Sequence, residues 1–374
     1  MLRRVARRGR TYSFTVHATE DPDGDERART ARLLRLQAAA CRDLGSVLYG
    51  DLLLHTADDL QSGGVTARVL DGYLDDRLAS GLALRLLGGV HAQVLCGGAP
   101  ELAAFYPSAG GTPERALGSP RAWAAFQQVL AEHHAEVRSW LGHPPQTNEV
   151  GRAAALLGGL RHITAEARLP IRLVEVGTSA GLNLRADWFC VPGPAGSYGD
   201  AQSPVVLVGG WQGSAPPVSP IEVVERIGGD IAPVDPLTED GRLRLTAYVW
   251  PDQHERLERL RGALRIASQV AADLRAERAS ATLARTRLVA GTWTVVWHSI
   301  FRQYLTQAER AELVAGIAEL GAAATPQARF AWLFFEQSAA GGCRVTLTTW
   351  PGQERRVLGS APAHGLPVHW RVSG

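Results

Sequence analysis

A short stretch in the middle of the chain combines one acidic residue with closely spaced small residues. Glu175 is followed by Gly177, Ser179 and Gly181, and an apolar, β-branched run precedes them. Such a run is typical of a buried strand in a parallel sheet, and a helix is predicted over residues 182–188. A strand, a glycine loop and a helix in this order aim backbone N–H groups at an anionic ligand. The stretch therefore predicts a binding site for a small polar molecule.

Two kinds of enzyme use such a loop, and the sequence is compatible with both. Glu175 and the spaced glycines resemble the first motif of the S-adenosylmethionine-dependent methyltransferases, with Ser179 in place of the middle glycine. On this interpretation Glu175, Gly177, Ser179 and Gly181 bind the cofactor. The same residues spell G-x-S-x-G, the nucleophile elbow of α/β-hydrolases, which would make Ser179 a nucleophile. A third interpretation is that the glycines only let a helix pack closely on a strand.

Other candidate side chains lie before and after this loop. His298 follows a predicted buried strand, and the carboxyl ends of parallel strands are where open α/β sheets bind ligands. His298 is therefore the predicted acid or base, together with Glu149 in the first turn of a helix predicted to begin at Thr147. We expect His298, Glu149 and Glu175 to converge on one cleft, although a helix dipole alone also explains a first-turn Glu. The predicted substrate-binding residues are Tyr106, Asn148, Asp230 and Asp235.

The elements that must position these residues divide the chain. Residues 1–27 are predicted to be a flexible tail, because charged residues dominate and apolar periodicity is missing. Residues 28–168 have helical periodicity throughout and predict an all-helical domain. Residues 169–374 show strand–loop–helix units and then antiparallel strands, which predicts a Rossmann-like α/β domain. The glycine loop thus follows the first strand, as in Rossmann-type sheets, whereas a hydrolase elbow follows several strands.

The second strand of this sheet is predicted at residues 203–208. In a methyltransferase of ordinary type this strand ends in an acid that binds the ribose of the cofactor. Here the run is followed by Gly209-Gly210-Trp211, with no acid at that place. The segment 222–227 is predicted to be a further short strand.

Composition narrows the functional classes. The chain has 374 residues, 45% hydrophobic residues and a formal charge of +2, which argues against a general nucleic-acid surface. All its positive charge is arginine. No apolar run reaches membrane-spanning length, and no signal-peptide core is present. The four cysteines are scattered and no histidines stand at ligand spacing, so we expect a cytoplasmic protein without a metal.

Taken together, motifs along nearly the whole chain resemble an uncharacterised bacterial family known only as a domain of unknown function, DUF2332. The resemblance runs from about Ala31 to Trp370. It rests on residues 106–108, 146–152, 175–187, 230–236, 249–253, 295–299, 350–352 and 364–365. It implies a helical N-terminal part on a methyltransferase-like Rossmann part.

These observations favour a small-molecule-modifying enzyme that resembles S-adenosylmethionine-dependent methyltransferases, with a small-molecule substrate and no nucleic-acid or membrane partner. One alternative is a tailoring enzyme that works without this cofactor, by elimination, cyclisation or hydrolysis. Ser179, an Asp at 230 or 235 and His298 would follow the hydrolase order Ser, Asp, His. The other alternative is a non-catalytic ligand-binding protein, in which Glu149, Glu175 and His298 are satisfied structural groups.

Overall fold

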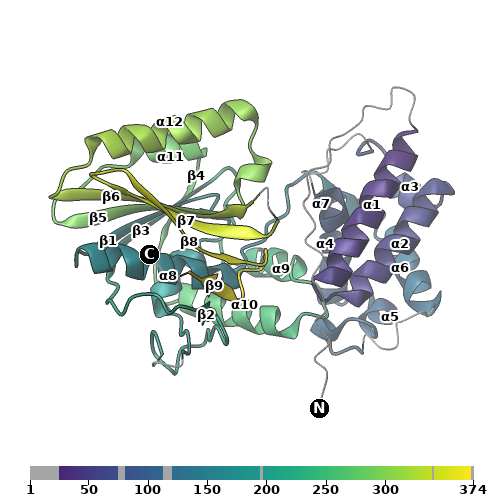
Figure 1. Cartoon of the computed structure of the whole chain (residues 1–374). Helices are drawn as coiled ribbons and strands as arrows, with labels where there is room; N and C mark the ends of the chain where they lie inside the picture. The colour runs from purple at the N-terminus through teal and green to yellow at the C-terminus, as the bar shows by residue number, and fades with distance from the viewer. Residues whose placement is uncertain (1–24, 75–80, 113–119, 194–196, 339–340, 372–374) are drawn as a thin grey trace, which may run out of the picture.

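The computed structural model describes residues 25–74, 81–112, 120–193, 197–338 and 341–371. The predicted tail lies outside these residues up to position 24, and the first helix begins at Glu26, inside the predicted tail. Figure 1 shows a helical part beside a sheet with helices on both faces. Within the described residues, no helix is long and apolar enough to cross a membrane.

The helical part forms because its Ala- and Leu-rich segments each bury one face. Asp25 and Ser46 cap the first two helices by accepting hydrogen bonds from backbone N–H groups. The helices enclose an apolar core of their own. Their bounds are α1 (Glu26–Asp43), α2 (Val47–Gln61), α3 (Val65–Val69), α4 (Leu82–Leu95), α5 (Pro100–Ala103), α6 (Pro120–Glu132) and α7 (His134–Leu141).

The described strands form a nine-stranded, mostly parallel sheet in the order β2-β9-β8-β7-β6-β5-β1-β3-β4. Strands β4, β3, β1, β5 and β6 are parallel, and β7, β8 and β9 follow as antiparallel neighbours. The edge strand β2 pairs in parallel with β9. The bounds are β1 (Ile171–Val176), β2 (Trp211–Gly213), β3 (Val223–Asp230), β4 (Asp273–Ala276), β5 (Thr292–Ser299), β6 (Ala328–Gln337), β7 (Cys343–Trp350), β8 (Glu354–Ala361) and β9 (Val368–Trp370).

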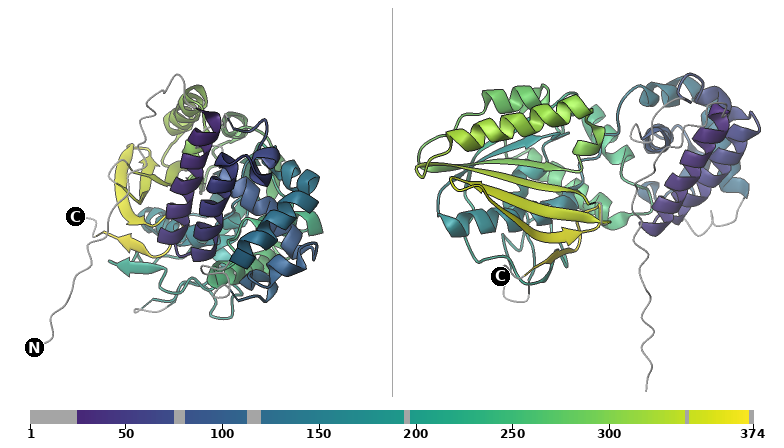
Figure 2. Two further views of the ribbon diagram at one scale, coloured as in Figure 1. Left: turned by 90° about the vertical axis from the view of Figure 1, so that its right-hand side faces the viewer. Right: turned by 45° about the horizontal axis from the view of Figure 1, so that its top comes forward.

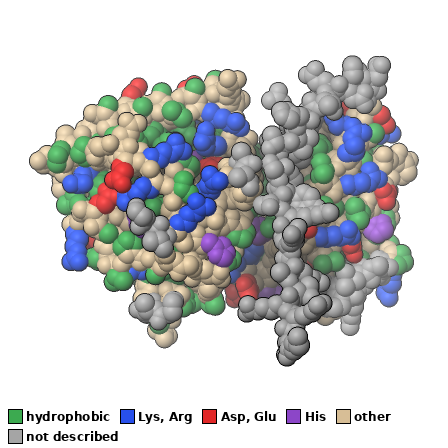
Figure 3. Space-filling model, in the orientation of Figure 1, with side chains coloured by type: hydrophobic (Ala, Val, Ile, Leu, Met, Phe, Trp, Pro, Cys, Tyr) green, Lys and Arg blue, Asp and Glu red, His purple; other side chains and the backbone are tan. Residues whose placement is uncertain are grey.

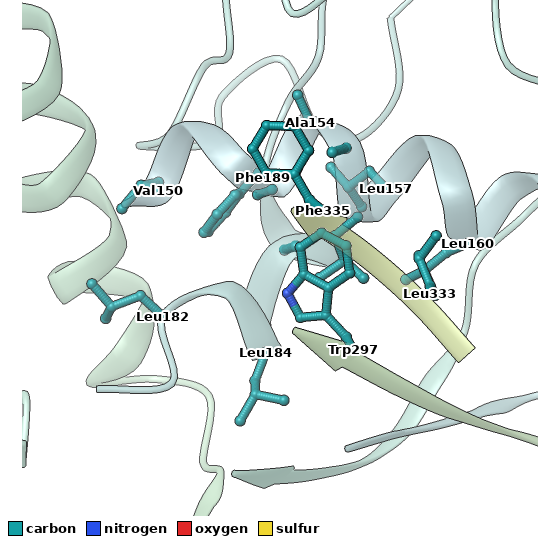
Figure 4. Close-up of a cluster of buried hydrophobic side chains, with 14 of the residues drawn as sticks. Val150, Ala154, Leu157, Leu160, Leu182, Leu184, Phe189, Trp297, Leu333 and Phe335 are labelled. Carbon is teal, nitrogen blue, oxygen red and sulfur yellow. The ribbon is translucent and has the colours of Figure 1, made fainter. Parts of the chain in front are cut away.

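Helices cover both faces of the parallel strands. Helices α8 (Ala153–Glu166) and α10 (His254–Ala267) contribute to the apolar core on one face. Helices α11 (Ala279–Arg285) and α12 (Gln307–Ala323) cover the other face (Figure 1). Helix α8 lies within the predicted helical domain, yet its side chains pack on Trp297, Leu333 and Phe335 of the sheet (Figure 4).

The predicted second strand at residues 203–208 is wrong. This segment makes only an isolated bridge, Cys190 with Val206, although Val205 and Leu207 are buried in the core. Strand β1 pairs with β5 on one side and with β3 on the other. Strand β3 confirms the strand predicted at 222–227 and continues to Asp230, so the strand beside β1 does end in an acidic residue.

The helical part docks on the loop that precedes α10. Helix α9 (Glu239–Ala247) packs against α4, and the loop follows it directly. The Ser46 hydroxyl donates to Asp252 (2.9 Å), and the Gln253 side chain donates to the Leu44 carbonyl (2.8 Å). The Ser108 N–H donates to the Pro251 carbonyl (3.0 Å). The right-hand view in Figure 2 shows the helical part beside the sheet, with the α9 and α10 segments between them.

Candidate functional site

A cavity of about 130 Å³ lies at the carboxyl ends of β1, β3 and β5. The chain runs from β1 outward to β3 and β4, and then returns to the other side of β1 as β5. Open α/β sheets bind their ligands at such a reversal of strand order. The lining residues are Pro144, Pro145, Gln146, Thr147, Asn148, Arg152, Glu175, Gly177, Ser179, Asn183, Asp230, Ile231, Ser299, Ile300, Phe301 and Tyr304.

A second cavity of about 100 Å³ adjoins the first. The two share Gly177, Asp230, Ile231, Phe301 and Tyr304 as lining residues. The second cavity continues toward the loop after β4 and the start of α12, where Glu277, Arg278 and Glu309 are among its lining residues. One elongated site can therefore run along this edge of the sheet.

The backbone N–H groups at the start of the glycine loop bond within the protein. Those of Gly177 and Thr178 donate to the Gly229 carbonyl (2.8 and 3.3 Å). The Ser179 N–H donates to Asp230 Oδ2 (2.9 Å). The other carboxylate oxygen of Asp230, Oδ1, accepts a hydrogen bond from the Ala232 N–H (2.9 Å). Asp230 therefore holds the loop while it also lines the cavity.

The second half of the loop is closed in the same way. The Gly181 N–H donates to the Thr178 carbonyl (2.9 Å), and the Leu182 N–H donates to Asn148 Oδ1 (2.8 Å). The segment after it is a six-residue 3₁₀-helix, η5 (Asn183–Trp188), instead of the predicted α-helix. The N–H groups of Gly177, Thr178, Ser179, Gly181 and Leu182 therefore already have acceptors within the protein and do not face an anion as expected.

The glycines of the loop have conformational reasons to be there. Gly177 and Gly181 have φ of 71° and 64°, in the left-handed region that glycine tolerates best. A Cβ at Gly177 would lie 2.3 Å from the ring of Phe301. Ser179 also has a positive φ, 53°, and its hydroxyl donates to Gln146 Oε1 (2.7 Å). The conformation of the loop is therefore fixed by Phe301, which packs against Gly177, and by Gln146, which accepts from Ser179.

Glu175 is a buried carboxyl group on the cavity wall. Its Oε2 accepts a hydrogen bond from the Thr178 hydroxyl (2.8 Å). Burial raises the pKa of Glu175 to about 8, although the Thr178 hydrogen bond acts in the opposite direction. A strongly shifted carboxyl group beside a cavity is a frequent mark of a functional site.

The segment 144–148 forms the part of the cavity wall that is hydrogen-bonded to the glycine loop. Gln146 accepts from the Ser179 hydroxyl and donates to the Ala232 carbonyl (3.2 Å). Asn148 lines the cavity as predicted, and its side-chain oxygen caps the loop at Leu182. These contacts make the segment part of the site.

Glu149 lies next to this wall but does not line the cavity. Its Oε2 accepts from Arg256 Nε (2.6 Å), and its Oε1 accepts from the Gly151 N–H (3.1 Å). Both side chains are buried. Burial is the largest single effect and favours the neutral carboxyl group. The guanidinium of Arg256, His364, Arg152 and the Gly151 hydrogen bond together outweigh it and lower the pKa of Glu149 to about 2. Glu149, and not the predicted Thr147, caps the short helix η4 (Val150–Arg152).

Several polar residues of the cavity wall were not predicted as site residues, among them Gln146, Arg152 and Asn183. Gln146 and Arg152 belong to a segment that the sequence analysis singled out, and Asn183 belongs to another. Arg152 donates to the carbonyls of Ala363 (3.1 Å) and Ser299 (3.3 Å) through Nε and Nη1. Asn183 donates through Nδ2 to the Glu149 carbonyl (3.3 Å), while its buried Oδ1 has no partner among the described residues.

The structure does not bring His298 to the cavity, so the expected convergence with Glu149 and Glu175 is wrong. Trp297 points toward α8 (Figure 4), and alternation along the strand directs His298 to the opposite face. His298 Nδ1 lies 2.8 Å from Glu336 Oε1, and Trp332 Nε1 donates to its Nε2 (3.1 Å). Because an indole N–H only donates, Nε2 is the acceptor of this hydrogen bond, and Nδ1 donates to Glu336.

Two predicted substrate residues also lie elsewhere. Tyr106 is fully buried in the core of the helical part, beside Tyr49 and His91. Asp235 is exposed, and its carboxylate caps the N–H of Leu237 (2.9 Å) in a turn. Of the four predicted substrate residues, Asn148 and Asp230 line the cavity.

The hydrolase triad does not form. Ser179 hydrogen-bonds to Gln146, while His298 lies on the other face of the sheet with Glu336.

The described His, Cys, Asp and Glu residues do not gather in a group of three that could hold a metal ion. On the face shown in Figure 3, arginines and acidic side chains are interspersed with neutral ones.

Comparison with known proteins places almost the whole chain in one family. Residues 31–370 match the sequence profile of a family described as an uncharacterized protein conserved in bacteria (DUF2332). No curated protein matches the chain. No solved structure matches it either.

Proposed function

The chain belongs to the bacterial DUF2332 family, and we propose that it is a small-molecule-modifying enzyme that binds S-adenosylmethionine beside the glycine loop. The observation that carries the proposal is the placement of two carboxyl groups. Glu175 and Asp230 stand at the ends of the adjacent parallel strands β1 and β3, and both line the same cavity. In Rossmann-type sheets, an acid near the end of the second strand binds ribose hydroxyls.

The bonding of the loop supports a cationic cofactor over a phosphate-bearing one. Five N–H groups of the loop that could otherwise bind a phosphate, those of residues 177, 178, 179, 181 and 182, already have acceptors within the protein. The polar groups left facing the cavity include the carboxyl groups of Glu175 and Asp230 and the guanidinium of Arg152. S-Adenosylmethionine carries an ammonium, a carboxylate and a sulfonium, so its charges fit these side chains.

Each of these residues has a distinct role in the proposal. Glu175 accepts from the ammonium group, and Arg152 pairs with the carboxylate. Asp230 accepts from the ribose, because a carboxylate that takes two loop N–H groups still has lone pairs free. When bound, the cofactor supplies an electrophilic methyl group. Holding it in a fixed orientation in a partly dry cavity accounts for most of the expected rate.

The test is the binding of S-adenosylmethionine and S-adenosylhomocysteine to the full-length protein, measured by thermal shift and calorimetry. We expect both ligands to raise the melting temperature. Asp230→Asn should weaken both by roughly tenfold, since it removes a charge-assisted acceptor. Asp235→Asn is the matched control, because this exposed Asp lies in the same loop but outside the cavity. If neither ligand binds at millimolar concentration, the proposal is wrong and a cofactor-independent enzyme or a binding protein is favoured.

A further inference from the structure

The wall of the cavity contains a buried amide oxygen that has no hydrogen-bond donor among the described residues. Asn183 is 2% exposed, and its Oδ1 has no partner among the described residues. A buried amide oxygen without a partner costs free energy unless a ligand or a water supplies a donor. Glu175, also buried, lines the same cavity. The Asn183 oxygen therefore awaits a hydrogen-bond donor, whereas the Glu175 carboxyl group already accepts one from Thr178.

The orientation of the Asn183 amide is set by its neighbours. Its Nδ2 donates to the Glu149 carbonyl, and Glu149 is itself held by the buried ion pair with Arg256. The Asn183 nitrogen therefore donates to the Glu149 carbonyl, and the Asn183 oxygen remains free to accept a hydrogen bond from a ligand. An amide fixed in this way selects a donor such as an N–H over a carboxylate.

We propose that the inner end of the cavity recognises a ligand ammonium group through Glu175 and Asn183, and that binding releases one proton from the protein. The inference deepens the proposed function and rests on it for the position of the ligand, but it requires only the amino-acid end. No covalent bond of the ligand changes. The Glu175 carboxyl group loses its proton to the solvent, and the carboxylate then pairs with the ammonium.

The proton release follows from the surroundings of Glu175. Burial keeps this carboxyl group mostly protonated at neutral pH, since its pKa is about 8. The charged groups that act on it are Asp230 at the end of β3, Arg152 on the opposite wall and Arg185 on η5. Asp230 raises the pKa and Arg152 lowers it, each by less than burial does. An ammonium in contact with the carboxylate lowers the pKa further, so the proton leaves.

Three probes separate the parts of the ligand. S-Adenosylhomocysteine carries both an amino-acid end and an adenosyl end, L-methionine carries only the first, and 5′-methylthioadenosine only the second. Calorimetry at pH 7 in buffers of different ionisation enthalpy counts the protons released. We expect close to one proton for the two amine-bearing probes and none for methylthioadenosine. Their affinity should rise by up to roughly tenfold per pH unit from pH 6 and level off near pH 8.

Two variants assign the effect to its residues. Glu175→Gln should abolish the proton release and flatten the pH dependence, because an amide has no proton to lose. Asn183→Leu should weaken the amine-bearing probes by roughly 10- to 100-fold and leave methylthioadenosine unchanged, while proton release persists. Asp235→Asn should leave the affinities and the proton count unchanged.

The outcomes also distinguish this inference from the proposed function. If L-methionine binds with proton release but no adenosyl compound binds, the inference stands and the proposed function fails. If S-adenosylhomocysteine binds without proton release, or Glu175→Gln still releases a proton, the proposed function stands and the inference is overturned. If no amine-bearing probe binds, both are overturned.

Discussion

Glu175 and His298 stand at the ends of two paired strands but face opposite sides of the sheet. In the register of β1 and β5, Glu175 is opposite Trp297, so both side chains share the α8 face. His298, the next residue along β5, points to the α12 face and meets Trp332 and Glu336. Glu175 therefore lines the cavity, whereas His298 and Glu336 form hydrogen bonds on the opposite face that hold the loop at Phe301.

The first prediction is that His298→Asn lowers stability and leaves ligand binding intact. Glu336 accepts from His298 and also from the N–H groups of Phe301 (2.9 Å) and Arg302 (3.2 Å), so it anchors the cavity loop. Removing the imidazole leaves buried polar groups without their partner, which costs about 1–3 kcal/mol. Urea unfolding should show this loss, and calorimetry with S-adenosylhomocysteine should show an affinity within about threefold of wild type. If His298→Asn abolished ligand binding without a change in stability, His298 would have to be a ligand-binding residue after all.

Most strands were predictable because buried strands have an apolar pattern. The exceptions have physical causes. The strand predicted at 222–227 continues in β3 through Gly228 and Gly229, which look like a turn in the sequence, to Asp230. In the structure a Cβ at Gly228 would lie 2.6 Å from the Thr178 side chain, and one at Gly229 would lie 1.9 Å from Thr282. Close packing therefore requires glycine inside a strand, and a local pattern does not show this.

For a related reason, only some of the predicted site residues line the same cavity. Position along the chain identified the sheet edge, so Glu175, Asn148 and Asp230 were found. The packing of α8 and α12 on the sheet decides which face of a strand borders the cavity. Trp297 faces α8 and His298 faces α12, although they are neighbours in the sequence. Local sequence cannot show such long-range packing.

The second prediction concerns Gly177→Ala. This residue needs a left-handed backbone, and its new Cβ would clash with Phe301. The matched control is Gly209→Ala, which has a similar φ of 63° but no atom within 4 Å of its Cβ. The control should lose about 1 kcal/mol from backbone strain alone, whereas Gly177→Ala should lose about 2–4 kcal/mol and should no longer bind S-adenosylhomocysteine. Equal losses in thermal or urea unfolding would show that Phe301 moves aside at little cost.

The third prediction is that Ser179 is not a nucleophile. Its hydroxyl donates to the Gln146 amide oxygen, which is a poor base, and the predicted histidine partner lies across the sheet. A nucleophilic serine needs an adjacent general base. A serine-reactive fluorophosphonate should therefore leave the protein unlabelled in intact-mass spectra. Stoichiometric labelling that Ser179→Ala abolishes would support the hydrolase interpretation instead.

The fourth prediction is that the Glu149–Arg256 pair stabilises the junction between the two parts of the chain. Arg256 also donates to Gln253, which donates in turn to the Leu44 carbonyl in the helical part. Glu149→Gln leaves a buried guanidinium without its counter-charge and should cost about 3–5 kcal/mol. The double variant Glu149→Leu with Arg256→Leu should recover part of this loss, because an apolar pair often replaces a buried ion pair at little cost. Urea unfolding of the three proteins measures both effects.

The same pair predicts a defined acid dependence. Because the folded-state pKa of Glu149 is lowered to about 2 from an ordinary value of 4.5, its contribution is fully present above pH 4.5. That contribution is lost progressively as the pH falls from about 4.5 toward 2. The wild type should therefore lose more stability than the double variant over this interval in parallel unfolding experiments. Identical acid profiles for the two proteins would show that Glu149 is not held as a carboxylate by Arg256.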